Sequence, residues 1–317
     1  RRLLDEIAAL RIIDTHEHLP LEKDLPKEDA DVLASWLTHY FSCDLVSAGL
    51  PLPVLVEAKN TRLDLRERLE RIEPFWRKAR NTGYARALYR TARDLFGVDD
   101  INGRTLPALN EAVRAARKGQ NGYYRWLLGE KSRIAVSIVD PLGSTVMAEA
   151  LAASDPFVYT HRAGTYLQPP HCMEMQRKGA EVGVSVHSLE DWEEVIRRHL
   201  KRFLVDEERV VCLKVGEAYN RILHFQKRTH AEAEAVFIKW FQEEHSPASH
   251  PAPGPSRVLQ DYLMHEVLRF ADAHGLVIQI HTGIQEGHGN VITDANPTHL
   301  TNLFLEYSNV RFDLFHM

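Results

Sequence analysis

The feature that most constrains the fold is a regular alternation of short apolar runs with amphipathic segments. The runs are almost continuously apolar, as in parallel strands that are covered on both faces. The segments between them carry apolar residues at helical spacing. The runs cover residues 11–15, 133–140, 157–161, 210–215, 276–280 and 310–315. This alternation predicts βαβ units and a parallel sheet in an α/β fold.

The number of predicted strands points to a barrel that this chain leaves incomplete. We count about six strands, whereas a TIM (β/α)8-type barrel closes with eight. A doubly wound sheet of six strands is the competing fold. No glycine fingerprint follows the first strand, which weakens that alternative.

The apolar runs divide the chain into three parts. Residues 1–27 hold the first strand and a His-x-His motif, and residues 131–317 hold strands two to six. Residues 28–130 have helical patterning and are too long for an ordinary connection, so we expect a helical insertion or subdomain there. A stretch rich in Pro, Ser and His, 244–256, predicts a surface loop. Because the chain starts without Met and stops at Met317 inside an apolar run, we expect a fragment whose natural form continues and supplies strands seven and eight.

Composition argues against several classes of partner. The formal net charge is −5 with no long basic run, so nucleic acid is not an expected partner. No run approaches the ~18 apolar residues of a membrane span, so no membrane partner is expected. The three cysteines, Cys43, Cys172 and Cys212, are odd in number and far apart, which favours a reducing compartment and a cytoplasmic location.

Histidines stand at the ends of three predicted strands: His16 and His18 after the first, His281 after the fifth and His316 after the sixth. In a parallel barrel all strand carboxyl ends share one face, so these side chains can converge. Residues two apart on an extended chain point the same way, which lets His16 and His18 reach one metal. Neutral imidazoles suit Zn, Fe, Mn or Ni, and three protein ligands with an open position form a catalytic arrangement. A single histidine among 17 is usually a surface or core residue, but the joint pattern favours a site.

A lysine inside a buried strand, Lys214, needs an explanation, because such a residue is paired, neutralised or used. It could bridge metals after carboxylation or contact the substrate. Alternatively, it could reach Glu217 or Asp140 as an ion pair, and the sequence leaves these readings open.

Three further residues could bind a substrate. Tyr219 and Arg221 follow the same strand and could hold a substrate carboxylate, and Arg162 is a weaker candidate after the third strand. The Gly-rich loop 285–290 could shape the pocket. It lacks the Lys-Ser/Thr of a phosphate loop, so phosphate binding is not expected there.

Taken in order, four motifs resemble those of the amidohydrolase superfamily of metal-dependent TIM barrels. The motifs are IIDTHEH, LKVGEAYNR, IQIHTG and FDLFH. The chain looks most similar to the amidohydrolase-2 branch, which includes uronate isomerase, aromatic-acid decarboxylases and the hydrolase-like domain fused to glutamine synthetase in nodulin-type proteins. The long helical region after the first strand is similar to uronate isomerase.

This resemblance implies roles for the strand-end residues. It implies His16, His18 and His281 as metal ligands, and His316 as a second-metal ligand or as the catalytic acid/base. Lys214 would be a bridging carbamate in binuclear subtypes, and would serve the substrate or the structure in the mononuclear sites usual for this branch. The family also places an Asp after strand eight, for which this chain has no counterpart. Family members are often oligomers, so a homo-oligomer is possible.

The expected function is therefore a metal-dependent hydrolase of a small polar, carboxylate-bearing substrate, acting through metal-activated water. The expected cofactor is a divalent metal, with Zn²⁺ as first choice and one or two ions. Metal-dependent decarboxylation or uronate isomerisation would use the same ligands. A reading of another class is a non-catalytic barrel that acts as a binding or scaffold module.

Overall fold

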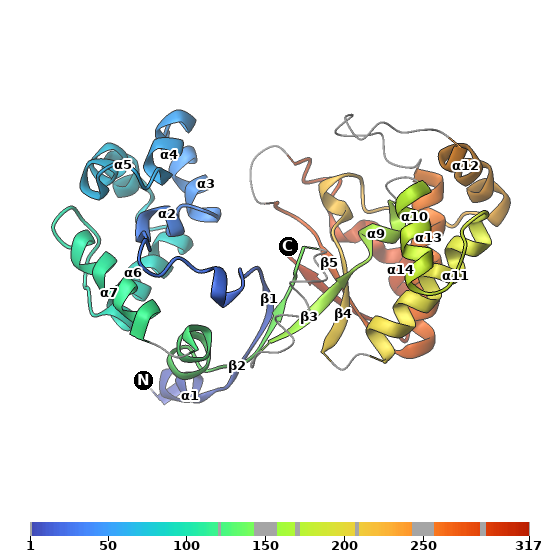
Figure 1. Cartoon of the computed structure of the whole chain (residues 1–317), viewed down its shortest axis with the longest axis horizontal. Coiled ribbons are helices and arrows are strands. Elements are labelled where there is room, and N and C mark those ends of the chain that lie inside the picture. The colour runs from blue at the N-terminus through green and yellow to red at the C-terminus, as the bar shows by residue number, and fades with distance from the viewer. Residues whose placement is uncertain are drawn as a thin grey trace. The chain divides into compact units, whose positions relative to one another are not determined.

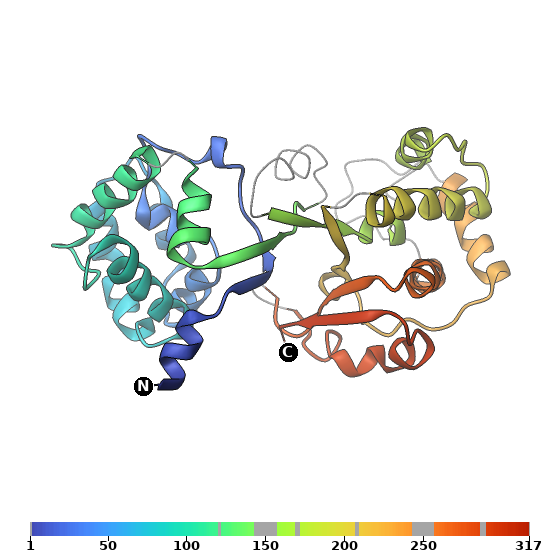
Figure 2. The ribbon, with the colours of Figure 1, turned by 90° about the horizontal axis from the view of Figure 1, so that it is seen from below.

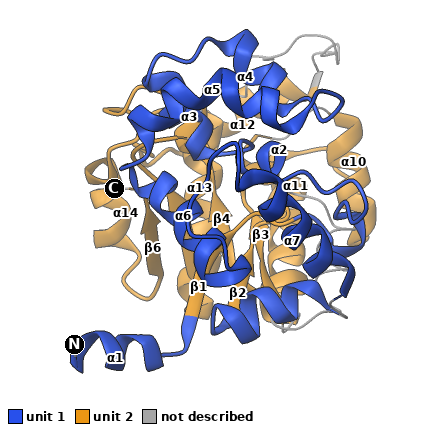
Figure 3. Cartoon of the chain, turned by 90° about the vertical axis from the view of Figure 1, so that its left-hand side faces the viewer, with its two compact units in different colours: residues 1–12, 20–135, 286–289 blue, residues 13–19, 136–285, 290–317 orange. Residues whose placement is uncertain are grey.

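The computed structural model describes residues 2–119, 122–142, 157–168, 172–206, 209–242, 257–285 and 290–316. The loop predicted at 244–256 and the glycines of the loop 285–290 lie outside these ranges. The chain divides into two compact units, which Figure 3 colours separately. Unit 1 comprises residues 1–12, 20–135 and 286–289, and unit 2 comprises residues 13–19, 136–285 and 290–317.

The sheet has six strands, and each pairs with the next one along the chain in the order β1-β2-β3-β4-β5-β6. The strands are β1 Ile12–Glu17, β2 Ile134–Val139, β3 Phe157–Arg162, β4 Val210–Val215, β5 Val277–His281 and β6 Arg311–Phe315. The pairs from β2 to β6 are parallel. A doubly wound sheet would reverse its strand order at a switch point, whereas this order follows the winding of a barrel. The structure therefore confirms an incomplete TIM-type barrel and excludes the competing fold.

The helices of unit 2 gather on one side of the strands (Figures 1 and 2). They are α9 Gly164–Leu167, α10 Cys172–Glu181, α11 Leu189–Leu200, α12 His230–Gln242, α13 Arg257–His274 and α14 Thr301–Glu306, with short helical turns at Lys201–Val205, Glu217–Tyr219 and Pro297–Leu300. Their apolar faces form one core with the outward side chains of the strands, and Trp192, Leu263 and Ile278 are fully buried in it. This burial leaves the opposite face of the sheet for the polar side chains described below.

A capping box opens α11. The Ser188 side chain accepts a hydrogen bond from the backbone N–H of Asp191 at 3.2 Å, and the Asp191 carboxylate accepts one from the backbone N–H of Ser188 at 3.1 Å. The two bonds satisfy donors that the first turn of a helix leaves unpaired. The helix then buries Trp192, Ile196 and Leu200, which lie at helical spacing on one face.

Unit 1 consists mainly of helices, which confirms the predicted helical insertion after the first strand. They are α1 Arg2–Ala9, α2 Val32–Trp36, α3 Tyr40–Ser47, α4 Leu52–Lys59, α5 Leu65–Ala79, α6 Gly83–Phe96 and α7 Leu106–Gly119, with short helical segments at Glu22–Asp24 and Arg125–Lys131. Leu45, Ile72 and Leu106 lie in a core that shares no residue with the core of unit 2. Among the described helices, none combines the length and the apolar character that a membrane crossing requires.

Candidate metal centre

Two histidines reach the candidate site from β1. This strand runs through Glu17, beyond the predicted end at residue 15, so His16 lies in the strand and His18 directly after it. The two rings approach to 4.6 Å between centroids, nearly at right angles. The backbone N–H of Asp140 donates to the carbonyl of Glu17 at 2.9 Å, which joins the ends of β1 and β2 at this point.

The hydrogen bond of His18 fixes its tautomer. Its Nδ1 lies 3.1 Å from the backbone carbonyl oxygen of Asp140. Because a carbonyl can only accept, Nδ1 carries the proton in the neutral ring, and Nε2 of that tautomer has the lone pair. Metal-binding histidines are oriented in this way, by a backbone or carboxylate partner on the other ring nitrogen.

His16 is held in the form that binds metals. Burial, together with the positive charge of Lys214, lowers the pKa of His16 to about 3. The ring is therefore neutral near pH 7, as a metal ligand must be. Its Nδ1 is buried without a hydrogen-bond partner among the described residues.

Asp140 completes a group of three possible ligands. One ligand atom each from His16, His18 and Asp140 lies within 4.8 Å of the others. Arg162 donates from Nε to Oδ1 of Asp140 at 2.8 Å and from Nη2 to Oδ2 at 2.7 Å, and Leu142 N–H donates to Oδ1 at 3.0 Å. Burial alone would raise the pKa of Asp140, but the hydrogen bonds and charge of Arg162 outweigh it and lower that pKa. The carboxylate is therefore ionised, and Oδ2 retains a lone pair for a cation.

These three donors fit a divalent transition metal, because two neutral imidazoles and one carboxylate suit Zn, Fe or Mn. Sequence reasoning considered Asp140 only as a partner of Lys214 and missed it as a ligand. The signal was present, since Asp140 follows β2 directly. The strand-end argument that selected the histidines applies equally to this residue.

The other two predicted histidines adjoin this group but are not among its three ligands. His281 ends β5, and its Nε2 lies 3.3 Å from the carbonyl oxygen of Ile284. Burial, with the charges of His316 and Lys214, lowers the pKa of His281 to about 4. The rings of His281 and His316 are 4.7 Å apart, and those of His316 and His16 are 6.3 Å apart. The structure thus brings all four predicted histidines together, while their roles stay predictions.

Lys214 lies in one row of side chains that crosses the sheet. In the register of the sheet, Lys214 on β4 is paired with Arg162 on β3 and with Gln279 on β5. Gln279 is in turn paired with Asp313 on β6. The Lys214 ammonium lies 3.7 Å from the centroid of the Phe315 ring and has no hydrogen-bond partner among the described residues. The alternative of a close pair with Glu217 or Asp140 is therefore not realised. Burial lowers the pKa of Lys214 to about 8.

The remaining predicted substrate-binding residues differ in whether their side chains are already bonded within the protein. Arg162 is paired with Asp140, and the ring of Tyr219 lies 4.6 Å from that of His281. Arg221 is buried, and its guanidinium donates to four oxygens, those of Asp261, Gln260, His224 and Ile222. A substrate would have to break these bonds, so the geometry gives the predicted role of Arg221 no support.

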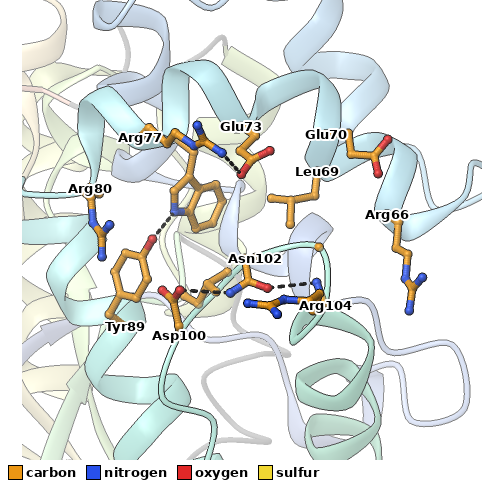
Figure 4. A pocket seen from close by; sticks show the side chains of 13 residues that line it. Arg66, Leu69, Glu70, Glu73, Arg77, Arg80, Tyr89, Asp100, Asn102 and Arg104 are labelled. Carbon is orange, nitrogen blue, oxygen red and sulfur yellow. Dashed lines mark hydrogen bonds and ion pairs between the residues drawn. The ribbon is translucent and has the colours of Figure 1, made fainter.

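Each unit contains a cavity, and the larger of the two has no histidine in its lining. It measures about 560 Å³, lies within unit 1 and is shown in Figure 4. Its walls are tied together by hydrogen bonds of Trp76 to Tyr89, Arg77 to Glu73 and Asn102 to Asp100, and its lining contains no histidine or cysteine. The smaller cavity, about 400 Å³, lies within unit 2.

The smaller cavity adjoins the candidate metal centre. Arg162 and Lys214 line it together with Glu217. Arg162 also holds Asp140, and the Phe315 ring beneath Lys214 stacks on His16 at 4.7 Å. A ligand in this cavity would therefore lie next to the three possible metal ligands.

Comparison with known proteins places this arrangement in a known fold. No family model and no curated protein matches the chain. Its structure is similar to glucuronate isomerase from Caulobacter crescentus, with 18% identity, a TM-score of 0.69 and coverage of 98% of this chain and 69% of that one. It is also similar to uronate isomerase from Thermotoga maritima, with 14% identity, a TM-score of 0.74 and coverage of 99% and 72%.

A third similar structure is a proposed metal-dependent hydrolase from Lactobacillus casei, with 17% identity, a TM-score of 0.57 and coverage of 99% and 69%. At such identities the likeness concerns the fold, and it confirms the resemblance expected from the four motifs at that level. The chain thus has the fold of the uronate isomerase structures to which it is similar.

Proposed function

We propose that the chain is a metal-dependent enzyme, a hydrolase of a small polar substrate that carries a carboxylate. The observation that supports this most is the group formed by His16, His18 and Asp140, whose ligand atoms lie within 4.8 Å of one another. All three stand at the carboxyl ends of parallel strands, where barrel enzymes have their active sites.

The proposed cofactor is one divalent metal, with Zn²⁺ as first choice, held by His16, His18 and Asp140, with His281 as a further proposed ligand. When bound, such an ion polarises a substrate carbonyl and lowers the pKa of water. The protein supplies orientation: the Asp140 carbonyl fixes the tautomer of His18, and Arg162 fixes the Asp140 carboxylate.

We assign proton transfer to His316. Its ring lies 4.7 Å from that of His281 and 6.3 Å from that of His16, next to the proposed ligands. Burial, with the charges of Lys214 and His18, lowers the pKa of His316, so the ring is neutral near pH 7 and a ring nitrogen can accept a proton. Lys214, Tyr219 and Arg162 are the proposed contacts of the substrate.

Uronate isomerisation is the second candidate function. Two of the similar structures are a glucuronate isomerase and a uronate isomerase, and this likeness favours it over decarboxylation. Product analysis after incubation with lactones, amides, uronates and aromatic acids separates the reactions. A ketose acid formed from a uronate would support isomerisation, and an acid released from a lactone or amide would support hydrolysis.

The first test is metal content, measured by plasma mass spectrometry on the wild type and on a His16→Ala/His18→Ala variant. We expect about one equivalent of Zn, Mn or Fe in the wild type and its loss in the variant. His187→Ala is the matched control, because His187 is exposed on the loop before α11 and should keep the metal. A folded wild type that takes up no metal even after loading would favour a binding or scaffold module instead.

The proposed partner is a small-molecule substrate, and neither nucleic acid nor a membrane is proposed. The expected homo-oligomer and cytoplasmic location remain predictions. The cytoplasmic expectation depends on the cysteines, and Cys43, Cys172 and Cys212 are free in the structure.

A further inference from the structure

Two buried polar atoms in the smaller cavity have no hydrogen-bond partner in the part of the chain that the structure describes. Lys214 and Glu217 are each 2% exposed, and both line the cavity of about 400 Å³ in unit 2. The Lys214 Nζ and the Glu217 Oε2 have no hydrogen-bond partner among the described residues. Burying a charged or polar group without a partner destabilises a protein, so such a pair is expected where a ligand supplies the missing bonds.

The other charges around this cavity are already paired. Arg162 is held by Asp140, and Arg177 pairs with Glu174 at 2.6 Å. Lys178, by contrast, makes no ion pair with the described residues, and its ammonium lies 5.9 Å from the Tyr166 ring centroid. Arg177 also pairs with Glu181, and the negative charges of Glu181 and Glu174 act on Lys178. Lys214 therefore supplies the positive charge that an anionic group in this cavity can neutralise.

Glu217 supplies a hydrogen-bond acceptor of a different kind. Burial raises its pKa to about 7. A Cβ at Gly164 would come within 3.2 Å of the Glu217 Oε1, so the glycine leaves room for the carboxyl group. The cavity thus presents an ammonium donor and a carboxyl acceptor on residues three positions apart in the chain.

We infer that this cavity binds a 2-hydroxy carboxylate, whose carboxylate accepts a hydrogen bond from Lys214 and whose hydroxyl donates one to Glu217. The inference rests on the proposed function, since it names the substrate class of that site. It also places the acid group beside Arg162, and so next to Asp140 in the candidate metal centre.

Binding of glycerate tests the inference, with propionate, which lacks the hydroxyl, and glycerol, which lacks the carboxylate, as matched probes. We would measure affinity by calorimetric titration of metal-stripped protein. Glycerate should bind at least about tenfold more tightly than either probe, because a hydrogen bond to a charged group is strong when desolvated. Equal affinity for the three probes would overturn the inference.

Lys214→Met and Glu217→Leu are the informative variants. Each should lower glycerate affinity about tenfold or more. Each should also unfold at a temperature no lower than the wild type, because an apolar side chain replaces an unpaired buried polar one. Lys201→Met, at an exposed lysine of unit 2, is the control and should bind glycerate as the wild type does. Full affinity in folded Lys214→Met protein would contradict the inference.

The His16→Ala/His18→Ala variant separates this inference from the proposed function. Hydroxy acids also chelate metals, but the variant should bind glycerate like the metal-stripped wild type. If metal uptake fails while glycerate binding persists and depends on Lys214, the proposed function fails and the cavity assignment stands. If metal binds but glycerate affinity vanishes with its removal, the cavity assignment fails alone.

Discussion

At the scale of single residues, the site depends on how Asp140 is shared. Its backbone carbonyl orients His18, and its side chain lies with His16 and His18 as a possible ligand. Arg162 donates twice to the same carboxylate. Asp140 therefore connects the proposed metal ligands His16 and His18 with Arg162, which lines the proposed substrate cavity.

Asp140→Asn should weaken metal binding, because it removes the negative charge from the ligand group and leaves Arg162 without a carboxylate partner. We expect a loss of at least about tenfold in affinity, the lower end of what changes around metal ligands produce. Competition with a metal-binding dye measures it. Asp206→Asn, at an exposed residue of unit 2, is the control. Equal affinity in both variants would remove Asp140 from the proposed ligand set.

Glu217 should make the stability of the protein depend on pH. Its pKa is raised from 4.5 to about 7 in the folded protein. Between these values the unfolded chain loses the proton while the folded chain keeps it, so stability falls as pH rises. The effect is about 3 kcal/mol at most over this window, at about 1.4 kcal/mol per pH unit.

Glu217→Gln removes this titration. Relative to the wild type, the variant should therefore gain stability between pH 4.5 and pH 8. Urea unfolding of both proteins at the two pH values measures the difference. If the difference stays constant with pH, the carboxyl group of Glu217 titrates normally.

At the scale of elements, local signals set the helix starts and the strand centres. The capping box places the start of α11, and the apolar run Val210–Val215 coincides with β4. The end of β1 was less predictable, because His16 and Glu17 are not strand-favouring residues. They are extended because the neighbouring strand continues the ladder, with Asp140 N–H donating to Glu17.

Ser188→Ala should destabilise the protein by about 1 kcal/mol, the usual contribution of an N-cap side chain. Ser188→Thr keeps a hydroxyl and should change stability by much less. The free energy of unfolding in urea measures both. Equal losses in the two variants would show that the hydroxyl of Ser188 does not cap α11.

At the scale of the whole molecule, the main cores of the two units share no residue among those that the structure describes. Leu45 is fully buried in the core of unit 1, and Leu263 is fully buried in that of unit 2. In each core, replacing a buried leucine by alanine should lower the free energy of unfolding by about 2–5 kcal/mol. The two units should therefore respond separately to mutation.

Scanning calorimetry of Leu45→Ala and Leu263→Ala tests this independence. Each variant should lower one thermal transition and leave the other in place, and Leu45→Ala should keep its metal content. Leu305→Ala is the control, because this side chain is 81% exposed. A single transition that moves equally in both core variants would show that the units unfold together.

The sequence alone determined the order of strands and helices and the histidines at the strand ends. Those features depend on local periodicity and on residue type, which a chain carries wherever it folds. The ligand group with Asp140, the internal bonds of Arg221 and the unpaired atoms of Lys214 and Glu217 were decided only in the tertiary structure. Each depends on which side chains from separate segments of the chain meet in the folded protein, and contacts between segments that are far apart in sequence leave no local pattern to read.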